Sequence, residues 1–261
     1  MVVSEEDSDT EPTGAATKLY KFAEPATGYY LGFDKDTYPG DTLMTAWWTN
    51  SPFWYVGFYL APAPNHTDTS WMTKRSHLKA QGWGFLVTYV GLQEGSSSLS
   101  YARGETDAVN AASLATSAGF PLGTTIFLDI ESGGTLPTNL ISYITGWVHK
   151  IVVGTIFNAG VYCSRLSAAQ IKTAVGTDPV FFWCTNLQCP TPSPGCNASM
   201  LPPNPANCGY SGAIVWQYAE SPVPAGTGCT NYSGNLCTLT YGASSTSVDL
   251  DTADSQNPSN G

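Results

Sequence analysis

Basic residues are scarce in this 261-residue chain. Ten Lys and Arg stand against 20 Asp and Glu, which gives a formal net charge of −10. The nearest approach to a basic cluster, formed by Lys74, Arg75 and Lys79, has the spacing of one solvated helix face. Because phosphate binding requires a basic surface, this composition argues against nucleic acid as a partner.

Long apolar runs are missing as well. No run approaches the roughly 20 residues that a membrane-spanning helix needs, so we expect no membrane span. Met1-Val2-Val3 leads directly into acidic residues, without the basic start and apolar stretch of a secretory signal peptide. If the protein is secreted, we expect the sequence to be that of a mature form.

Histidine is rare, and two common site patterns are lacking. His66, His77 and His149 lie far from the cysteines in sequence, and no Cys-x-x-Cys pair is present, which argues against a zinc site. No G-x-S-x-G motif occurs and no histidine ends a predicted strand, which disfavours a serine hydrolase. We therefore expect neither a metal nor a cofactor.

The seven cysteines point to an oxidising compartment. Five lie in late, Pro/Gly/Asn-rich segments whose spacing indicates disulfides: Cys189, Cys196, Cys208, Cys229 and Cys237. The odd count leaves at least one thiol unpaired within the chain, and Cys163 and Cys184, inside predicted strands, are the candidates for buried free thiols. The glycosylation sequons at Asn65, Asn197 and Asn231 fit a secreted glycoprotein.

Strand-like and helix-like segments alternate through one domain. Residues 1–17 are acidic and lack periodic apolar positions, which predicts disorder. The expected strands cover residues 29–34, 54–60, 84–91, 124–131, 160–163, 179–184, 213–218 and 247–251. The expected helices cover 42–49 (with Asp41 as N-cap), 72–81, 104–119, 137–153 and 167–175.

Eight strands with intervening helices predict an α/β fold, a (β/α)8 TIM-barrel-like domain over residues 18–254. The last units are short of helix, so we expect the barrel to be flattened or incomplete there. Cysteine-bearing insertions at 188–212 and 220–242 are predicted to be stapled by disulfides, and residues 255–261 to form a flexible tail.

The strand ending in Asp129-Ile130-Glu131 is the most informative stretch for function. A period of two places Asp129 and Glu131 on the same face, at the carboxyl end where α/β barrels collect their reacting groups. The alternative interpretation is that one carboxylate caps the next helix and the other is solvated. Asp34, Asp249 and Asp251 are also predicted at the ends of barrel strands. Crowding of these carboxylates would raise the pKa of at least one of them.

A series of short motifs is ordered along residues 29–252: Leu31-Gly32-Phe33-Asp34, Tyr55-Val56-Gly57-Phe58-Tyr59-Leu60, Gly82-Trp83-Gly84, Tyr89-Val90-Gly91-Leu92-Gln93, Gly104, Asp107-Ala108, Ala118-Gly119-Phe120-Pro121, the Gly123 to Glu131 strand, Gly160-Val161-Tyr162, Val215-Trp216-Gln217-Tyr218 and Val248-Asp249-Leu250-Asp251. By the order and spacing of these motifs, the chain resembles the glycoside-hydrolase-like domain of secreted microbial proteins, a neighbour of the family 25 muramidases, which cleave peptidoglycan glycan strands. The resemblance implies a TIM-barrel-like fold. The cysteine-rich insertions depart from it.

By this resemblance, Glu131 is the expected general acid. Asp129 would stabilise the oxocarbenium ion, or orient the acetamido group of the substrate if the mechanism is substrate-assisted. Asp34 and Asp249 would be supporting groups. Asp251 is a candidate substrate contact, and the competing interpretation is that it is a strand-end or cap residue.

Several aromatic residues are candidates for sugar binding. Trp216 and Tyr218, with Gln217 between them, either contact a sugar ring or belong to barrel packing. Tyr59 and Tyr89, at strand ends, are expected as groove walls, whereas Trp47, Trp48 and Trp54 are expected in the core.

The leading functional hypothesis is a secreted, monomeric glycosidase-like protein acting on a β-linked, N-acetylated polysaccharide such as peptidoglycan or chitin. A catalytically inactive carbohydrate- or wall-binding module that uses the same groove is the alternative. A third hypothesis is a structural protein whose barrel carries disulfide-stapled interaction loops.

Overall fold

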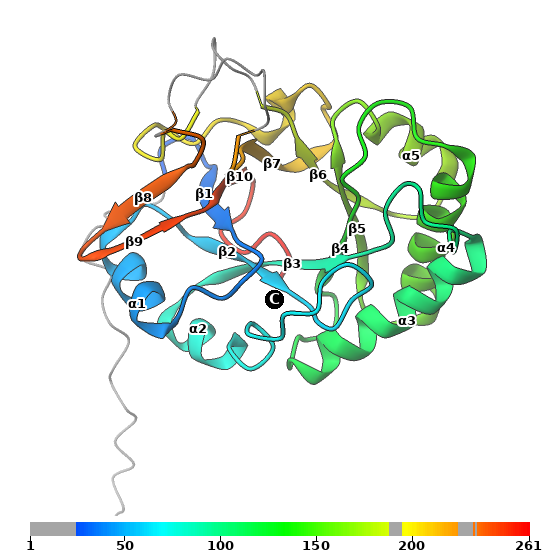
Figure 1. Ribbon diagram of the computed structural model, residues 1–261, viewed down its shortest axis with the longest axis horizontal. Coiled ribbons are helices and arrows are strands. Elements are labelled where there is room, and N and C mark those ends of the chain that lie inside the picture. The colour runs from blue at the N-terminus through cyan, green and yellow to red at the C-terminus, as the bar shows by residue number, and fades with distance from the viewer. Residues whose placement is uncertain (1–24, 188–194, 224–231, 233) are drawn as a thin grey trace, which may run out of the picture.

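The computed structural model describes residues 25–187, 195–223, 232 and 234–261. Eight strands close into a barrel in the order β1-β10-β7-β6-β5-β4-β3-β2 (Figure 1). Their bounds are β1 Tyr30–Asp34, β2 Tyr55–Tyr59, β3 Gly84–Val90, β4 Thr125–Asp129, β5 Asn158–Ser164, β6 Phe181–Thr185, β7 Ala213–Ala219 and β10 Asp249–Ala253. The expected TIM-barrel-like α/β fold is therefore confirmed.

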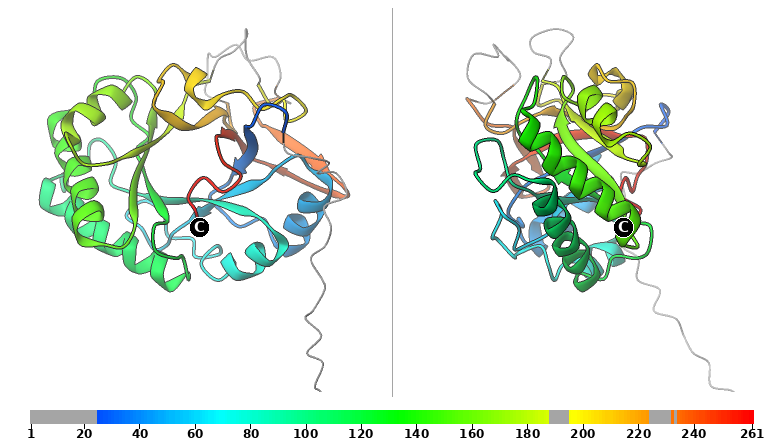
Figure 2. Two further views of the ribbon diagram at one scale, coloured as in Figure 1. Left: turned by 180° about the vertical axis from the view of Figure 1, so that it is seen from behind. Right: turned by 90° about the vertical axis from the view of Figure 1, so that its right-hand side faces the viewer.

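The α-helices in the described residues lie around the outside of the barrel: α1 Asp41–Asn50, α2 Arg75–Gln81, α3 Tyr101–Ser117, α4 Thr138–Gly154 and α5 Ala168–Val175. Figure 1 shows them around the strands from β2 to β6, and the right-hand view of Figure 2 looks onto α3, α4 and α5. The first residues of two helices differ from expectation. Gly40 rather than Asp41 is the N-cap of α1, and α2 begins at Arg75 rather than at residue 72.

The last units lack α-helices in the part of the chain that the structure describes. A short 3-10 helix, η1 (Pro205–Cys208), precedes β7, and a hairpin of β8 (Thr238–Tyr241) and β9 (Ser244–Ser247) precedes β10. The indole of Trp47 in α1 donates a hydrogen bond to the Ser244 carbonyl at 3.0 Å, which ties the hairpin to the barrel wall. The predicted shortage of helix in the last units is confirmed, but the hairpin was not predicted.

Strand β10 closes the barrel in the reverse direction. It pairs antiparallel with both β1 and β7, whereas the remaining barrel pairs are parallel. The strand expected over 247–251 begins at Asp249 instead, because Ser247 belongs to the hairpin. A reversed β10 therefore brings its amino end to the rim where the other strands end.

The alternation of side chains along each strand produces two apolar layers. Inside the barrel lies a small cluster of Tyr55, Leu86, Phe127, Tyr162, Trp183, Val215 and Ala253. The larger layer lies between the strands and the outer elements, and it includes Trp47 and Trp48, which are buried as expected. Trp54 is half-buried and packs against Tyr30.

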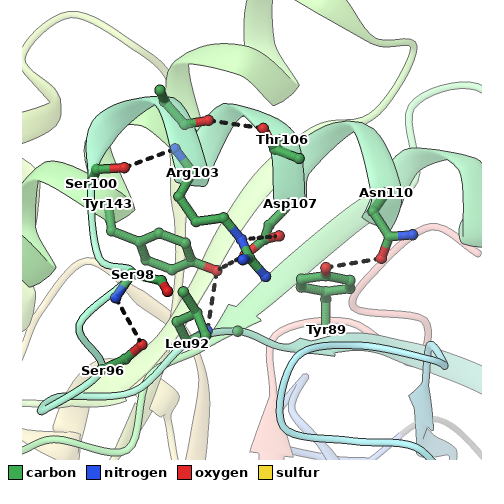
Figure 3. Close-up of polar contacts among 12 residues, drawn as sticks. Tyr89, Leu92, Ser96, Ser98, Ser100, Arg103, Thr106, Asp107, Asn110 and Tyr143 are labelled. Carbon is green, nitrogen blue, oxygen red and sulfur yellow. Dashed lines mark hydrogen bonds and ion pairs between the residues drawn. The ribbon is translucent and has the colours of Figure 1, made fainter.

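Helices α3 and α4 approach each other unusually closely. A Cβ atom at Gly104 would lie 2.1 Å from the Tyr143 carbonyl oxygen, and one at Gly146 would lie 2.2 Å from the Tyr101 carbonyl oxygen. Asp107 of α3 accepts a hydrogen bond from the Tyr143 hydroxyl of α4 at 2.8 Å (Figure 3). Glycine is therefore required on both sides of this helix contact.

The C-terminal residues 255–261 are tied to the start of β3 and β4. The Asn257 carboxamide oxygen accepts from the Phe85 N–H at 2.9 Å, and the Ser259 hydroxyl accepts from the Val87 N–H at 2.8 Å. The Ser259 carbonyl also accepts from the Thr125 N–H at 2.8 Å, and Ser259 is fully buried. These bonds replace the flexible tail that the polar composition predicts.

The structure confirms some of the predictions for the cysteines and contradicts one. Cys196 and Cys237 form a disulfide between the two predicted insertions. Cys163 and Cys184 are buried free thiols, as expected, but Cys208 is also a buried free thiol although a disulfide was predicted. Its sulfur accepts the Tyr210 N–H at 3.4 Å within the packed η1 region. Cys189, Cys229, Asn231 and the segment 1–17 lie outside the described residues.

Candidate active site

Two adjoining cavities of about 350 Å³ and 270 Å³ open at the rim of the barrel. Six residues line both of them: Asp34, Tyr59, Asp129, Glu131, Ser221 and Asp249. We call this shared opening the mouth. It brings together the four carboxylates that the sequence places at strand ends as catalytic candidates.

These four acids reach the mouth by two different routes. Asp34 and Asp129 are the last residues of β1 and β4, and Glu131 follows Asp129 by two positions. Asp249 is instead the first residue of β10, which runs in the opposite direction and pairs with Asp34 in register. Asp251, two residues further along β10, lines neither cavity and is fully buried, where its carboxylate accepts the Trp183 indole N–H at 2.9 Å.

Asp34 is held by neutral hydrogen-bond donors. The Tyr59 hydroxyl donates to its Oδ1 at 2.6 Å, and the Gln217 amide donates to its Oδ2 at 3.0 Å. The Tyr162 hydroxyl donates to the Gln217 Oε1 at 2.6 Å, which turns the amide nitrogen of Gln217 toward the acids. The same nitrogen lies 3.5 Å from Asp249 Oδ2, so Gln217 links two carboxyl groups.

The end of β4 is fixed by a side chain that sequence reasoning did not select as a site residue. Gln93 donates to the Asp129 carbonyl at 2.9 Å and accepts the Glu131 N–H at 2.9 Å. Glu131 is exposed to solvent, whereas Asp129 is only 6% exposed and its Oδ1 has no hydrogen-bond partner in the part of the chain that the structure describes. The pair therefore presents one open and one buried carboxyl group to the same mouth.

Burial dominates the electrostatics of these acids. It raises the pKa of Asp129 well above its ordinary value, and the negative charges of Glu131 and Asp34 raise it further. Burial and the charge of Asp34 likewise raise the pKa of Asp249 and of Asp251. For Asp34 itself, burial raises the pKa against the opposing effect of the Tyr59 and Gln217 hydrogen bonds. These four aspartates consequently retain protons at a higher pH than ordinary carboxyl groups.

Two further residues of the mouth were missed by sequence reasoning. Glu220 follows β7 directly and lines the second cavity, where the Thr185 hydroxyl donates to its Oε1 at 2.9 Å. Its position just after a strand is the signal that could have identified it. His66 lines the first cavity, is 8% exposed and leaves Nε2 without a hydrogen-bond partner. It lies in a loop well past the end of β2, so no strand-end pattern marks it.

Three predicted sugar-contacting rings face away from the mouth. The Trp216 indole donates to the Asn186 carbonyl at 2.9 Å, and the Tyr218 hydroxyl donates to the Asn197 carbonyl at 3.4 Å. Tyr89 points outward to α3, where its hydroxyl donates to Asn110 at 2.9 Å (Figure 3). Since neighbouring residues of a strand point to opposite faces, an inward Gln217 forces Trp216 and Tyr218 outward. These contacts favour the packing alternative for Trp216 and Tyr218, and Tyr89, which was expected as a groove wall, lines neither cavity.

Tyr59 does line both cavities, as expected for a groove wall, and Tyr162 and Trp183 line the second cavity. Within the described residues, no group of three or more His, Cys, Asp or Glu side chains is arranged to hold a metal ion. Nor does any described helix have the length and apolar character needed to cross a membrane.

The model of the Rv2525c-like, glycoside hydrolase-like domain family matches residues 45–195, more than half of the chain. This chain belongs to that family. No curated protein matches the chain in sequence.

Solved structures with the same fold include a secreted protein, a spore cortex lytic enzyme and a glycosyl hydrolase. The Tat-secreted protein Rv2525c of Mycobacterium tuberculosis, in complex with L-tartrate, has a TM-score of 0.54 at 14% identity, covering 90% of this chain and 99% of that one. The spore cortex lytic enzyme SleM of Clostridium perfringens has a TM-score of 0.55 at 13% identity, covering 89% and 70%. GHIP, a glycosyl hydrolase 25 of Streptococcus pneumoniae, has a TM-score of 0.52 at 13% identity, covering 85% and 86%. The fold is thus related to that of the family 25 muramidases.

Proposed function

We propose that this protein is a secreted glycoside hydrolase that cleaves a β-linked, N-acetylated polysaccharide such as peptidoglycan or chitin. The observation that carries this proposal is the meeting of Asp34, Asp129, Glu131 and Asp249 in one solvent-open mouth. Paired carboxyl groups flanking a cavity supply both the proton donor and the negative charge that glycoside cleavage requires. The fold that this chain shares with a family 25 glycosyl hydrolase supports the same chemistry.

Glu131 is the proposed general acid, because it is the exposed member of the β4 pair and can reach the glycosidic oxygen of a glycan in the mouth. Asp129 stabilises the oxocarbenium ion, or orients the acetamido group in a substrate-assisted reaction. Asp34 and Asp249 are supporting groups, positioned by Gln217. Tyr59 and Gln217 are the proposed substrate contacts.

Secretion is supported by two observations. The Cys196–Cys237 disulfide requires an oxidising compartment to persist. The fold neighbour Rv2525c is described as Tat-secreted.

The test is a product-release assay on peptidoglycan and on chitin oligomers. We expect Glu131→Gln to lower the rate by about 10²-fold or more, the usual contribution of a general acid. Glu105→Gln, which makes the same change on α3 outside the mouth, serves as the control. Equal rates for wild type and Glu131→Gln would overturn the proposal.

The second candidate is a catalytically inactive glycan-binding module. The oriented amide of Gln217 and the raised pKa values of the buried acids favour it, because such groups form hydrogen bonds with sugar hydroxyls without any bond cleavage. Retained glycan affinity in Glu131→Gln, together with no product from wild type, would establish this alternative.

A further inference from the structure

The second cavity is lined by acidic residues, and no Lys or Arg lines it among the described residues. Its lining includes five carboxyl-bearing side chains, those of Asp34, Asp129, Glu131, Glu220 and Asp249. Among the described residues that line the two cavities, Lys35 is the only Lys or Arg, and it lines the first cavity. At pH values where these carboxyl groups are ionised, the low-dielectric walls focus their negative field on whatever occupies the second cavity.

A buried acceptor in the mouth lacks its donor. Among the described residues, Asp129 Oδ1 has no hydrogen-bond partner, although Asp129 is only 6% exposed and its side chain lines both cavities. An unsatisfied buried acceptor is costly, so it marks a position where a ligand donor is favourable. This observation is independent of the net charge of the cluster.

Glu220 adds an oriented carboxylate on the other side of the cavity. The Thr185 hydroxyl donates to its Oε1 at 2.9 Å, which holds the group at the carboxyl ends of β6 and β7. Tyr162 and Trp183 line the same cavity and supply the ring surface that a sugar requires.

We propose that the Glu220 side of the mouth binds the free ammonium group of an unacetylated hexosamine, so that the preferred substrate is a partly N-deacetylated glycan. This inference rests on the proposed function and specifies its substrate class. An ammonium group has three N–H donors and a positive charge, which match the unpaired Asp129 acceptor and the surrounding carboxylates.

Other occupants fit the second cavity less well. A sugar bearing a carboxylate or phosphate would be repelled by the acids. An acetamido group carries a single N–H and no charge, so it leaves most of the negative field unbalanced. A divalent metal ion is disfavoured because no described group of His, Cys, Asp or Glu side chains is arranged to hold one.

The experiment measures the binding of glucosamine and N-acetylglucosamine oligomers of equal length to Glu131→Gln, in which we expect turnover to be slow. We expect oligomers that contain free amines to bind at least about tenfold more tightly, and added salt to reduce this advantage. In Glu131→Gln/Glu220→Gln the advantage should largely disappear, while Glu131→Gln/Glu220→Asp, which keeps the charge, should retain part of it. Spermidine provides amines without sugar rings and should bind far more weakly than the glucosamine oligomer.

Equal or tighter binding of the fully acetylated oligomer would overturn the inference, even if the Glu220 variants failed to fold. Spermidine binding as tightly as the glucosamine oligomer would overturn the hexosamine assignment. Product-release assays with wild type separate this inference from the proposed function. Cleavage without a preference for free amines defeats only the inference, whereas amine-dependent binding without cleavage of any oligomer defeats only the proposed hydrolysis.

Discussion

Asp34 and Asp249 are paired in register between β1 and β10, and the Gln217 amide nitrogen lies 3.0 Å from one carboxylate and 3.5 Å from the other. Two acids from opposite ends of the chain can share this amide because β10 runs antiparallel to β1. Gln217 thus places a donor between groups that would otherwise repel each other. The arrangement of the mouth therefore depends on the uncharged Gln217 side chain between the two carboxyl groups.

Replacing Gln217 with glutamate tests this link with a side chain of nearly equal shape. At neutral pH we expect Gln217→Glu to lower the melting temperature, because a third carboxylate would face Asp34 and Asp249. The decrease in melting temperature should be smaller near pH 5, where the new carboxyl group can hold a proton and donate it in a hydrogen bond. Thermal unfolding at both pH values measures the effect, and Gln256→Glu at an exposed position is the control. An equal loss at both pH values would contradict the electrostatic explanation.

The stability of the protein should decrease as pH rises through the acidic range. Burial, then the charge of Asp34, raises the pKa of Asp251, so the folded state binds a proton more tightly than the unfolded chain does. Its contribution to stability is full below the ordinary pKa of about 4 and is lost as the pH rises through the folded pKa. Asp129 and Asp249 act in the same direction.

Asp251→Asn should flatten this pH dependence. Burial and the neighbouring Asp34 raise the pKa of Asp251, and a proton shared between the two carboxyl groups would satisfy Asp251 Oδ2, which has no other hydrogen-bond partner among the described residues. Asparagine keeps the oxygen that accepts the Trp183 indole N–H and offers a permanent donor toward Asp34. Chemical denaturation between about pH 4 and pH 8 checks this prediction. An unchanged slope in the variant would show that the pair does not share a proton.

Gly146→Ala should destabilise the fold by forcing α3 and α4 apart. The new Cβ atom would lie 2.2 Å from the Tyr101 carbonyl oxygen, a backbone atom that cannot rotate away. The expected loss is about 1–3 kcal/mol, typical of overpacked sites. Gly154→Ala in the same helix is the control, because its Cβ would meet only the flexible side chain of Lys150. Equal unfolding free energies for the two variants would refute the close contact.

Thiol labelling tests the cysteine arrangement. Under denaturing, non-reducing conditions, alkylation should modify Cys163, Cys184 and Cys208, whereas Cys196 and Cys237 should react only after reduction. In the native protein the three free thiols should be protected by burial. Peptide mass spectrometry identifies the modified residues. Labelling of Cys196 before reduction would contradict the disulfide.

The barrel and its acidic rim could be predicted from sequence because they depend on local patterns. The apolar run before Asp129 marks a buried strand, and a period of two fixes which residues share its face. The direction of β10 could not be predicted, because the alternation of polar and apolar residues is the same in a parallel and in an antiparallel strand. Asp249 therefore reaches the mouth from the amino end of its strand and not from the predicted carboxyl end.

Other differences arise from contacts that no local pattern contains. The same period of two that places Asp129 and Glu131 on one face places Trp216 and Tyr218 on the face opposite Gln217. The polar C-terminal residues suggested a loose tail, yet Asn257 and Ser259 bond to backbone groups of β3. Such long-range hydrogen bonds depend on the closed barrel and leave no signal in the segment itself.

The most direct test of the account is the rate at which four single variants release product from one partly N-acetylated oligosaccharide. The variants are Asp34→Asn, Asp129→Asn, Glu131→Gln and Asp249→Asn. If the four carboxyl groups act on one glycosidic bond, every variant should release product more slowly than wild type and than Glu105→Gln. Glu131→Gln should show a loss of about 10²-fold or more. Four folded variants that all release product at the wild-type rate would contradict the central claim.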